Sequence, residues 1–173
     1  MTARPEHPAS DRLALFALCG DLVVAIDVMS IREIRRVAET RARAVNRRMW
    51  ALELGGEREV ERVAGWDLGE LLGIATPATA WLIVDLPGPQ RRAGFRLGRC
   101  VTVQSLPTCR AIPRGVFTTR SRAIVAGFST AAIPELAGHV SGIVVDLARV
   151  LGDGELAAMA RLRKDGDETA LEL

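Results

Sequence analysis

The clearest pattern in the chain is an alternation with a period of two along residues 22–29. The even-numbered positions are all apolar and would face one side of an extended strand, while the odd-numbered positions face the other. An apolar run at residues 13–18 precedes this segment, and Gly20 and Asp21 between the two runs are typical of a tight turn. The pattern predicts a β-hairpin near the start of the chain, followed by an extended or turning segment over residues 30–37.

Further short apolar runs, bounded by glycine, proline or charged residues, predict the remaining strands. They cover residues 50–54, 57–66, 81–86, 92–97, 99–103, 117–128 and 140–145. Gly98, between two of these runs, is expected to permit a bend or a bulge. None of the runs approaches the roughly 20 apolar residues that a membrane-spanning helix needs, so we expect no membrane span and no direct insertion into a membrane.

Two segments have helical rather than strand-like spacing. Asp67 is expected to cap a short helix that Gly73 ends, because an aspartate and a glycine are preferred at these two boundaries. Near the end of the chain, Leu156, Met159 and Leu162 recur at the spacing of one helix face. We expect this terminal amphipathic helix to pack against the body of the protein, with binding of a separate partner as the alternative.

An internal repeat supports a duplicated architecture. Residues 67–73 read DLGELLG and residues 146–152 read DLARVLG, and each copy follows a strand-like run. A weaker similarity relates residues 25–34 to residues 95–104. Because a single small barrel rarely buries enough surface to be stable, the repeats indicate two related β-barrels packed into one body.

The composition sets the size and the class of the protein. A chain of 173 residues with 49% hydrophobic and 25% charged residues can bury one substantial core. We expect a flexible tail over residues 1–11, one domain of two barrel subdomains over residues 12–152, and a helix with a polar tail over residues 153–173. Three cysteines without paired spacing and a start without a secretion signal favour the reducing cytoplasm.

The charges are distributed in blocks. Arginine supplies all but one of the 23 basic residues: seven lie in residues 32–48, and eight lie in residues 91–122, which contain no acid. Residues 53–70 between these blocks are mostly acidic. Such blocks can steer binding to an acidic protein face or to nucleic acid. The alternative is that they are solvated strand faces that discourage aggregation.

The chain offers little catalytic chemistry. His139 is the only histidine outside the N-terminal tail, and its glycine-flanked position is typical of a turn rather than of a general base. We interpret Asp27 and Asp85 as facing solvent or bonding arginines, and Cys100 and Cys109 as small core residues. No phosphate-binding loop, dinucleotide motif or hydrolase motif is present. We therefore expect no catalytic residue, no metal and no cofactor, with an enzyme of unrecognised site as an alternative.

Nucleic-acid binding is a further alternative. The arginine block at residues 91–122 contains Phe95 and Phe117, and single-strand binders combine positive charge with aromatic stacking. Aromatic residues make up only 4% of the chain, however, and tyrosine is absent. An arginine-rich nucleic-acid-binding β-barrel protein is therefore the alternative function. DNA is not among the partners that we expect.

Residues 17–36, 65–73 and 142–151 resemble the CheW-like domain of bacterial chemotaxis. The family opens with a similar hairpin and has a DLxxxLG unit both midway and near its end. The resemblance implies an all-β fold with short helices: two interlocked five-stranded SH3-like β-barrels, here with a C-terminal helix. It also implies a non-catalytic cytoplasmic adaptor that couples a CheA-type histidine kinase, through the regulatory domain of the kinase, to the cytoplasmic tips of chemoreceptors.

The resemblance also implies which residues contact the partners. Ile31 and Glu33 match a valine-x-glutamate of the family's interaction surface. Most members carry an Asn-Leu-Arg-Gly turn whose arginine is tied to receptor binding, but here Glu59 occupies the arginine position. Arg58 or Arg62 could replace that arginine after a small shift, although a bidentate contact also depends on placement. The resemblance therefore implies a divergent member with an altered receptor contact.

Overall fold

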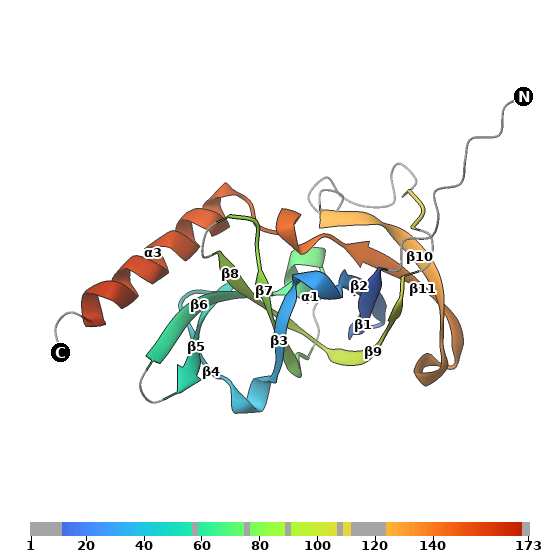
Figure 1. Cartoon of the computed structure of the whole chain (residues 1–173), viewed down its shortest axis with the longest axis horizontal. Helices are drawn as coiled ribbons and strands as arrows, with labels where there is room; N and C mark the ends of the chain where they lie inside the picture. The colour runs from blue at the N-terminus through green and yellow to red at the C-terminus, as the bar shows by residue number, and fades with distance from the viewer. Residues whose placement is uncertain are drawn as a thin grey trace, which may run out of the picture.

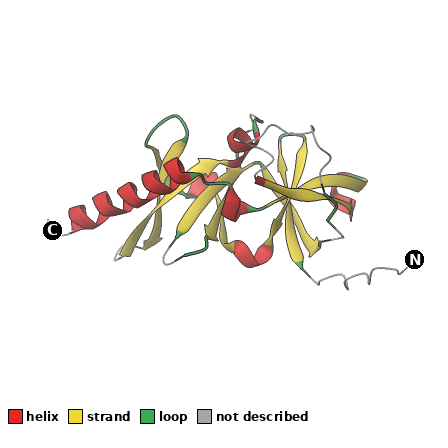
Figure 2. Ribbon diagram, turned by 90° about the horizontal axis from the view of Figure 1, so that it is seen from above, coloured by secondary structure: helices red, strands yellow, loops and turns green. Residues whose placement is uncertain are grey.

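Two β-sheets lie side by side along the long axis of the protein, and a long helix runs beside one of them (Figures 1 and 2). The computed structural model describes residues 12–56, 59–74, 77–88, 91–106, 109–111 and 124–170. The all-β prediction with short helices is confirmed. The expected tail over residues 1–11 lies outside the described residues.

Each sheet has strands from separate parts of the chain. The five-stranded sheet contains β1 (Leu13–Cys19), β2 (Leu22–Asp27), β9 (Arg99–Ser105), β10 (Val125–Ile133) and β11 (Gly138–Val145). The six-stranded sheet contains β3 (Ile31–Arg36), β4 (Arg41–Ala44), β5 (Met49–Gly56), β6 (Glu59–Asp67), β7 (Ala80–Asp85) and β8 (Arg92–Leu97). The helical elements are η1 (Val28–Ser30), η2 (Val37–Glu39), α1 (Leu68–Leu72), η3 (Pro134–Leu136), η4 (Leu147–Arg149) and α3 (Asp153–Ala170).

The two sheets share one strand order. Five strands of the larger sheet run β3-β7-β8-β6-β5, and the smaller sheet runs β9-β1-β2-β11-β10 with the same sequence of pairings. In both sheets only the third and fourth strands pair in parallel, β8 with β6 and β2 with β11. Strand β4 is the additional strand of the larger sheet and has no counterpart among the described residues. This correspondence matches both repeats in the sequence, including the weaker one that relates β2 and β3 to β8 and β9.

The chain crosses between the sheets at two equivalent places. It leaves the smaller sheet after β2 and begins the larger one at β3, with η1 between them. It returns after β8 and continues directly into β9, with only Gly98 between these strands. Because each crossing places neighbouring strands of the chain in different sheets, the two units are interlocked and form one body.

Three apolar clusters stabilise this arrangement. The largest lies between the two sheets, where Val24 and Ile26 of β2 pack with residues of the larger sheet such as Phe95. Val23 and Ala25, on the opposite face of β2, belong to a second cluster inside the smaller sheet. A third cluster fills the larger sheet. The period-two alternation in β2 is therefore confirmed. Both faces of β2 are buried, because β2 is the central strand of its sheet and has an apolar cluster on each side.

The terminal helix α3 closes one side of the main cluster. Leu156, Met159 and Leu162 are half-buried and pack against it, and α3 contacts β6. The helix therefore packs on the body, as the apolar spacing predicted. Figure 1 shows α3 beside the six-stranded sheet and away from β10 and β11.

The first aspartate-capped unit is tied tightly into the sheet. The Asp67 side chain accepts a hydrogen bond from the backbone N–H of Glu70, and Gly73 ends α1 with a φ of 80°. Asp67 is only 4% exposed, and Arg96 donates to one carboxylate oxygen from Nε at 3.0 Å and from Nη2 at 2.9 Å. The Arg96 guanidinium also lies 4.1 Å from the ring centre of Trp50. The charge of the buried aspartate is therefore compensated in place.

The second aspartate-capped unit is built more loosely. The Asp146 side chain accepts from the backbone N–H of Ala148, but the following turn is the 3₁₀ helix η4 rather than a second α-helix. Its arginine partner, Arg149, lies three residues away in the same turn and is exposed. The two aspartate-capped units are thus similar in their aspartate cap and in following equivalent strands, β6 and β11. They differ in the type of helix that follows the cap.

Other details also differ from the sequence-based expectations. The larger sheet has six strands rather than five, because the arginine-rich residues 41–44 form β4 without any apolar run. The strand expected over residues 117–128 is described only from Val125, and it extends to Ile133. Cys109 is exposed, so its interpretation as a core residue is wrong, whereas Cys100 packs partly against the main cluster.

Candidate functional site

The first crossing between the sheets exposes a large apolar side chain. The Asp27 side chain accepts a hydrogen bond from the Met29 backbone N–H at 2.9 Å, and the Ser30 hydroxyl donates to the Asp27 carbonyl oxygen at 2.7 Å. These bonds fix the turn η1, in which Met29 is 91% exposed. A single exposed methionine is unremarkable by itself, so the side chains around it decide whether a surface is present.

A bulge in β3, the strand that follows this turn, puts two isoleucines on one face. Ile31 pairs with Val84 and Ile34 with Leu82, and the register shifts between Ile31 and Glu33. Opposed residues in an antiparallel pair share a face, so the shift places Ile31 and Ile34 on the same face despite their odd separation. Ile34 is 47% exposed, while Ile31 is half-buried against the main cluster. We call Met29, Ile31 and Ile34 the crossing surface.

The charges next to the crossing surface are already paired. Each arginine of β3 has an acidic neighbour: Arg32 with Asp85 at 3.6 Å, Arg35 with Glu33 at 3.0 Å, and Arg36 with Glu39 at 3.3 Å. These pairs are partly or largely solvent-exposed, so each adds little to stability. Glu33 and Arg35 lie on the opposite face of β3, so the paired charges beside the crossing surface are those of Arg32 and Arg36. Neutralised charges beside exposed apolar side chains are the usual composition of a protein-docking surface.

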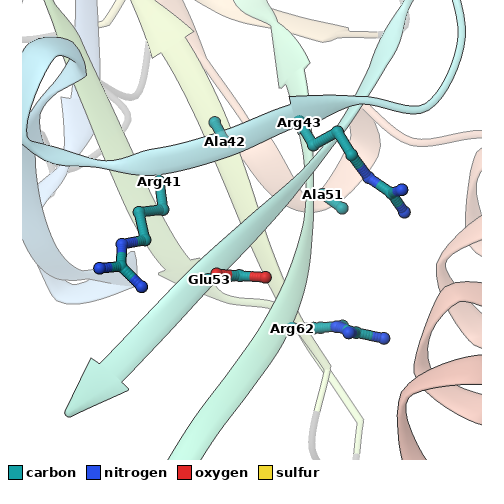
Figure 3. Close-up of a pocket in the computed structure, with 6 residues that line it drawn as sticks. All are labelled: Arg41, Ala42, Arg43, Ala51, Glu53 and Arg62. Atoms are coloured by element: carbon teal, nitrogen blue, oxygen red, sulfur yellow. The ribbon is translucent and has the colours of Figure 1, made fainter. Parts of the chain in front are cut away.

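A second surface feature lies on the other half of the larger sheet. A groove with a volume of about 470 Å³ runs over β4, β5 and β6, and it is lined by Arg41, Ala42, Arg43, Ala51, Glu53 and Arg62 (Figure 3). None of its three arginines forms an ion pair or a side-chain hydrogen bond with the described residues. The groove therefore differs from the crossing surface in having unneutralised positive charge.

The residues that the family resemblance implies as contacts are distributed over both features. Ile31 belongs to the crossing surface, while Glu33 pairs with Ile83 and lies on the opposite face of β3. Arg62 lines the groove on β6, which β7 and β8 separate from β3 in the sheet. Glu59 begins β6, and Arg58 lies outside the described residues. The structure therefore does not bring Ile31, Glu33 and Arg62 into one site.

Sequence reasoning missed Met29, Arg41 and Arg43. Met29 was taken as the end of a strand, although an aspartate at 27 followed by a serine at 30 is a common signature of a capped turn. Arg41 and Arg43 alternate with alanines, which gives no apolar periodicity, so only the charge indicated a surface strand.

The chemical groups considered from the sequence have structural roles. Asp85 is exposed and bonds two arginines, which confirms its interpretation, whereas the half-buried Asp27 caps a turn instead of bonding an arginine. Burial raises the pKa of Cys19 to about 11, so its thiol stays protonated and is a poor nucleophile at neutral pH. The residues described include no group of three or more side chains that could hold a metal ion. In the same residues no helix is both long and apolar enough to cross a membrane.

The aromatic residues cited for nucleic-acid stacking are not available on the surface. Phe95 is completely buried in the main cluster, and Phe117 lies outside the described residues. The groove is lined by alanine, arginine and glutamate, without an aromatic side chain. In the described part of the chain, the combination of basic and aromatic residues expected of a single-strand binder is therefore missing at this groove.

Comparison with known proteins identifies the fold. No protein-family model and no curated protein sequence matches the chain. The chain is similar to the crystal structure of the scaffolding protein TtCheW from Thermoanaerobacter tengcongensis, with a TM-score of 0.64 and 14% sequence identity. The alignment covers 90% of this chain and 96% of that one. The fold is therefore that of a CheW protein, with two β-barrel-like units, as the resemblance in the sequence implied.

Proposed function

We propose that this protein is a non-catalytic adaptor of the CheW type, which docks on the regulatory domain of a CheA-type histidine kinase through the crossing surface. The observation that carries the proposal is the exposure of Met29 in a turn that two hydrogen bonds hold in place. Ile34, 47% exposed on the strand that follows, extends the exposed apolar surface beyond one side chain, and extended apolar surface marks interaction sites. The similarity to a scaffolding protein supports the same role.

The chemistry of the crossing surface fits weak and reversible docking. Burying apolar surface contributes about 25 cal/mol per Å², and association itself costs several kcal/mol, so a small patch leaves only a modest net affinity. Adaptors compensate by multivalency, because linked binding events raise the effective concentration of each partner. The paired Arg32 and Arg36 of β3 would set orientation at the rim of the contact.

The proposal also includes a second partner. CheW-type coupling joins the kinase to the cytoplasmic tip of a chemoreceptor, and the protein would act in the cytoplasm. Glu59 stands where the family's receptor-binding arginine is expected, and Arg62 occupies the groove instead. We therefore propose that any receptor contact differs from that of the family in its residues.

A binding assay with matched variants tests the kinase contact. The full chain is titrated with the regulatory domain of a CheA-type kinase from the same organism, using Met29→Asp and Ile34→Asp as test variants. Val103→Asp is the control, because Val103 is 50% exposed on β9, the counterpart of β3 in the other sheet. We expect each test variant to weaken binding by about tenfold or more, since a charge placed in an apolar contact is left without a partner.

Two outcomes would contradict the proposal: no binding of the regulatory domain by the original protein, or equal binding by Met29→Asp and the original protein. Ile31→Asp is less informative, because Ile31 also packs against the main cluster and its replacement lowers stability. Thermal unfolding of each variant separates a lost contact from a lost fold.

A further inference from the structure

We propose that the groove over β4, β5 and β6 is a second docking site, which binds an acidic segment of a protein partner. This inference does not depend on the proposed kinase contact, because it concerns a different surface; it deepens the proposed second contact, for which Arg62 was named, by stating the chemistry of the partner. Figure 3 shows the groove residues: Glu53 lies between Arg41 and Arg62, and Arg43 and Arg62 extend to the same side.

The strand register explains why these side chains meet. Arg41 pairs with Glu53, and Glu53 pairs with Arg62, so the three form one row across neighbouring strands and share a face. Adjacent strands lie about 4.8 Å apart, which places the two arginines of the row roughly 10 Å from each other at the backbone. Arg43 pairs with Ala51 in the next row on the same face. Ala51, on the same face as the charges, has a small side chain that leaves the space between them open.

The charge of the groove is available to a ligand. Three arginines and one glutamate leave a net positive charge, and within the described residues none of the arginines has a partner. A guanidinium presents planar, forked donors that match the two oxygens of a carboxylate. The row of Arg41 and Arg62 can thus bind two acidic side chains of one segment.

Protection of a sheet edge does not account for the arrangement. Strand β4 is an edge strand, and arginines on it would discourage pairing with other chains. Arg62, however, lies on β6, the third strand from that edge, where pairing with another chain is not possible. Its position over the groove therefore needs another explanation, and ligand binding supplies one.

A peptide fits the groove better than a nucleic acid. Glu53 at the centre of the row repels the continuous negative charge of a phosphate backbone, and no aromatic side chain lines the groove for base stacking. A peptide segment carries carboxylates that can bind the arginines, and it also has backbone N–H groups that can donate hydrogen bonds to Glu53. The pattern of positive, negative and positive groups therefore favours an acidic protein segment.

Fluorescence anisotropy with a labelled glutamate-rich peptide tests this proposal on the full chain. The test variant is Arg41→Gln combined with Arg62→Gln. The control is Arg99→Gln combined with Arg110→Gln, which removes equal charge from two exposed positions, one on β9 and one bridged to Phe128 of β10. We expect the test variant to bind about tenfold more weakly and the control to change less than about twofold. The same peptide with glutamine in place of each glutamate should not bind the original protein.

Three results would overturn the proposal. Equal losses in the test and control variants would mean that only net charge matters, and equal binding of the glutamine peptide would mean that the carboxylates are not recognised. Tighter binding of a single-stranded oligothymidylate, lost in the same test variant, would assign the groove to nucleic acid instead. Binding of the kinase regulatory domain is measured in parallel, because it depends on Met29 and should survive the groove substitutions, so the two proposals can fail separately.

Discussion

At the first crossing between the sheets, the chain passes from β2 to β3 through the three residues of η1, whereas at the second it passes from β8 to β9 through Gly98 alone. Gly98 is buried, and a Cβ at this position would lie 2.5 Å from the carbonyl oxygen of Leu18. Met29, at the first crossing, is 91% exposed. Two connections with the same topological role therefore differ completely in their contact with solvent.

Comparing the two crossings distinguishes the residues that a connection between the sheets requires from those that are additional. The second crossing demonstrates that a single buried glycine is enough to connect the two sheets. The longer first crossing adds an aspartate cap and an exposed methionine that the connection itself does not require. Met29 gains nothing from burial, and because Ile34 is also exposed on the strand that follows, we attribute the two exposed side chains to a contact with another molecule.

The two aspartate-capped units also differ in exposure, and breaking the buried ion pair of the first unit should have the largest effect on stability. Arg96→Ala leaves the buried Asp67 without its partner, which we expect to lower the free energy of unfolding by about 3 kcal/mol. Arg149→Ala removes an exposed partner of Asp146 and should lower it by less than about 1 kcal/mol. Urea unfolding measures both, and equal losses would mean that Asp67 is not compensated as the geometry indicates.

The second crossing should be the more sensitive of the two to added volume. Gly98→Ala places a methyl group against the backbone of Leu18, which cannot move by a rotamer change, and we expect a loss of about 1–3 kcal/mol. Met29→Ala at the first crossing should change stability by less than about 0.5 kcal/mol. Thermal unfolding of both variants checks this contrast, and a smaller loss for Gly98→Ala than for Met29→Ala would reverse it.

The aspartate cap links the fold of the first crossing to its proposed role. Asp27→Ala removes the hydrogen bond to the Met29 N–H, and we expect a loss of about 1 kcal/mol, as for other caps of this kind. Because Met29 is then less firmly positioned, partner binding should weaken as well. Asp146→Ala is the matched control: it removes the corresponding cap from η4 and should leave partner binding unchanged. Equal partner binding by Asp27→Ala and Asp146→Ala would mean that the Asp27 cap does not contribute to docking.

The smallest effect concerns Cys19, a buried residue whose thiol interacts with the backbone of Gly98 at the second crossing. Burial raises the pKa of Cys19 from 9.0 to about 11. Below pH 9 the thiol is protonated in both the folded and unfolded states, so it adds no pH dependence. Above pH 9 the unfolded chain ionises first, and stability should fall as the pH rises towards 11. Cys19→Ala should flatten this decline in the urea midpoint, and an unchanged slope would contradict the raised pKa.

The strands with an apolar signal could be predicted from the sequence, and so could the capped helix at Asp67. The prediction failed where no such signal exists. Strand β4 consists of arginines and alanines, and it is held by pairing with β5 rather than by burial of its side chains. The order of the strands within each sheet was indicated only by the two short sequence repeats, because strand pairing between distant segments leaves no local pattern in the sequence.

The candidate site was harder to predict for a related reason. Ile31 and Ile34 share a face only because of a bulge in β3, and a residue separation of three gives no indication of this. Arg41, Glu53 and Arg62 meet through the register of three strands. Sequence similarity indicated Ile31 and Arg62 as contact residues, but not that they lie on different surfaces.

The most direct test of the docking role of the crossing surface is amide hydrogen exchange of the full chain, with and without the regulatory domain of the CheA-type kinase. Binding through this surface should slow exchange over residues 28–36 and leave β10 and β11 unchanged. In Met29→Asp the slowing should disappear. Protection confined to β10 and β11, or no protection anywhere when the kinase domain is bound, would contradict docking at the first crossing.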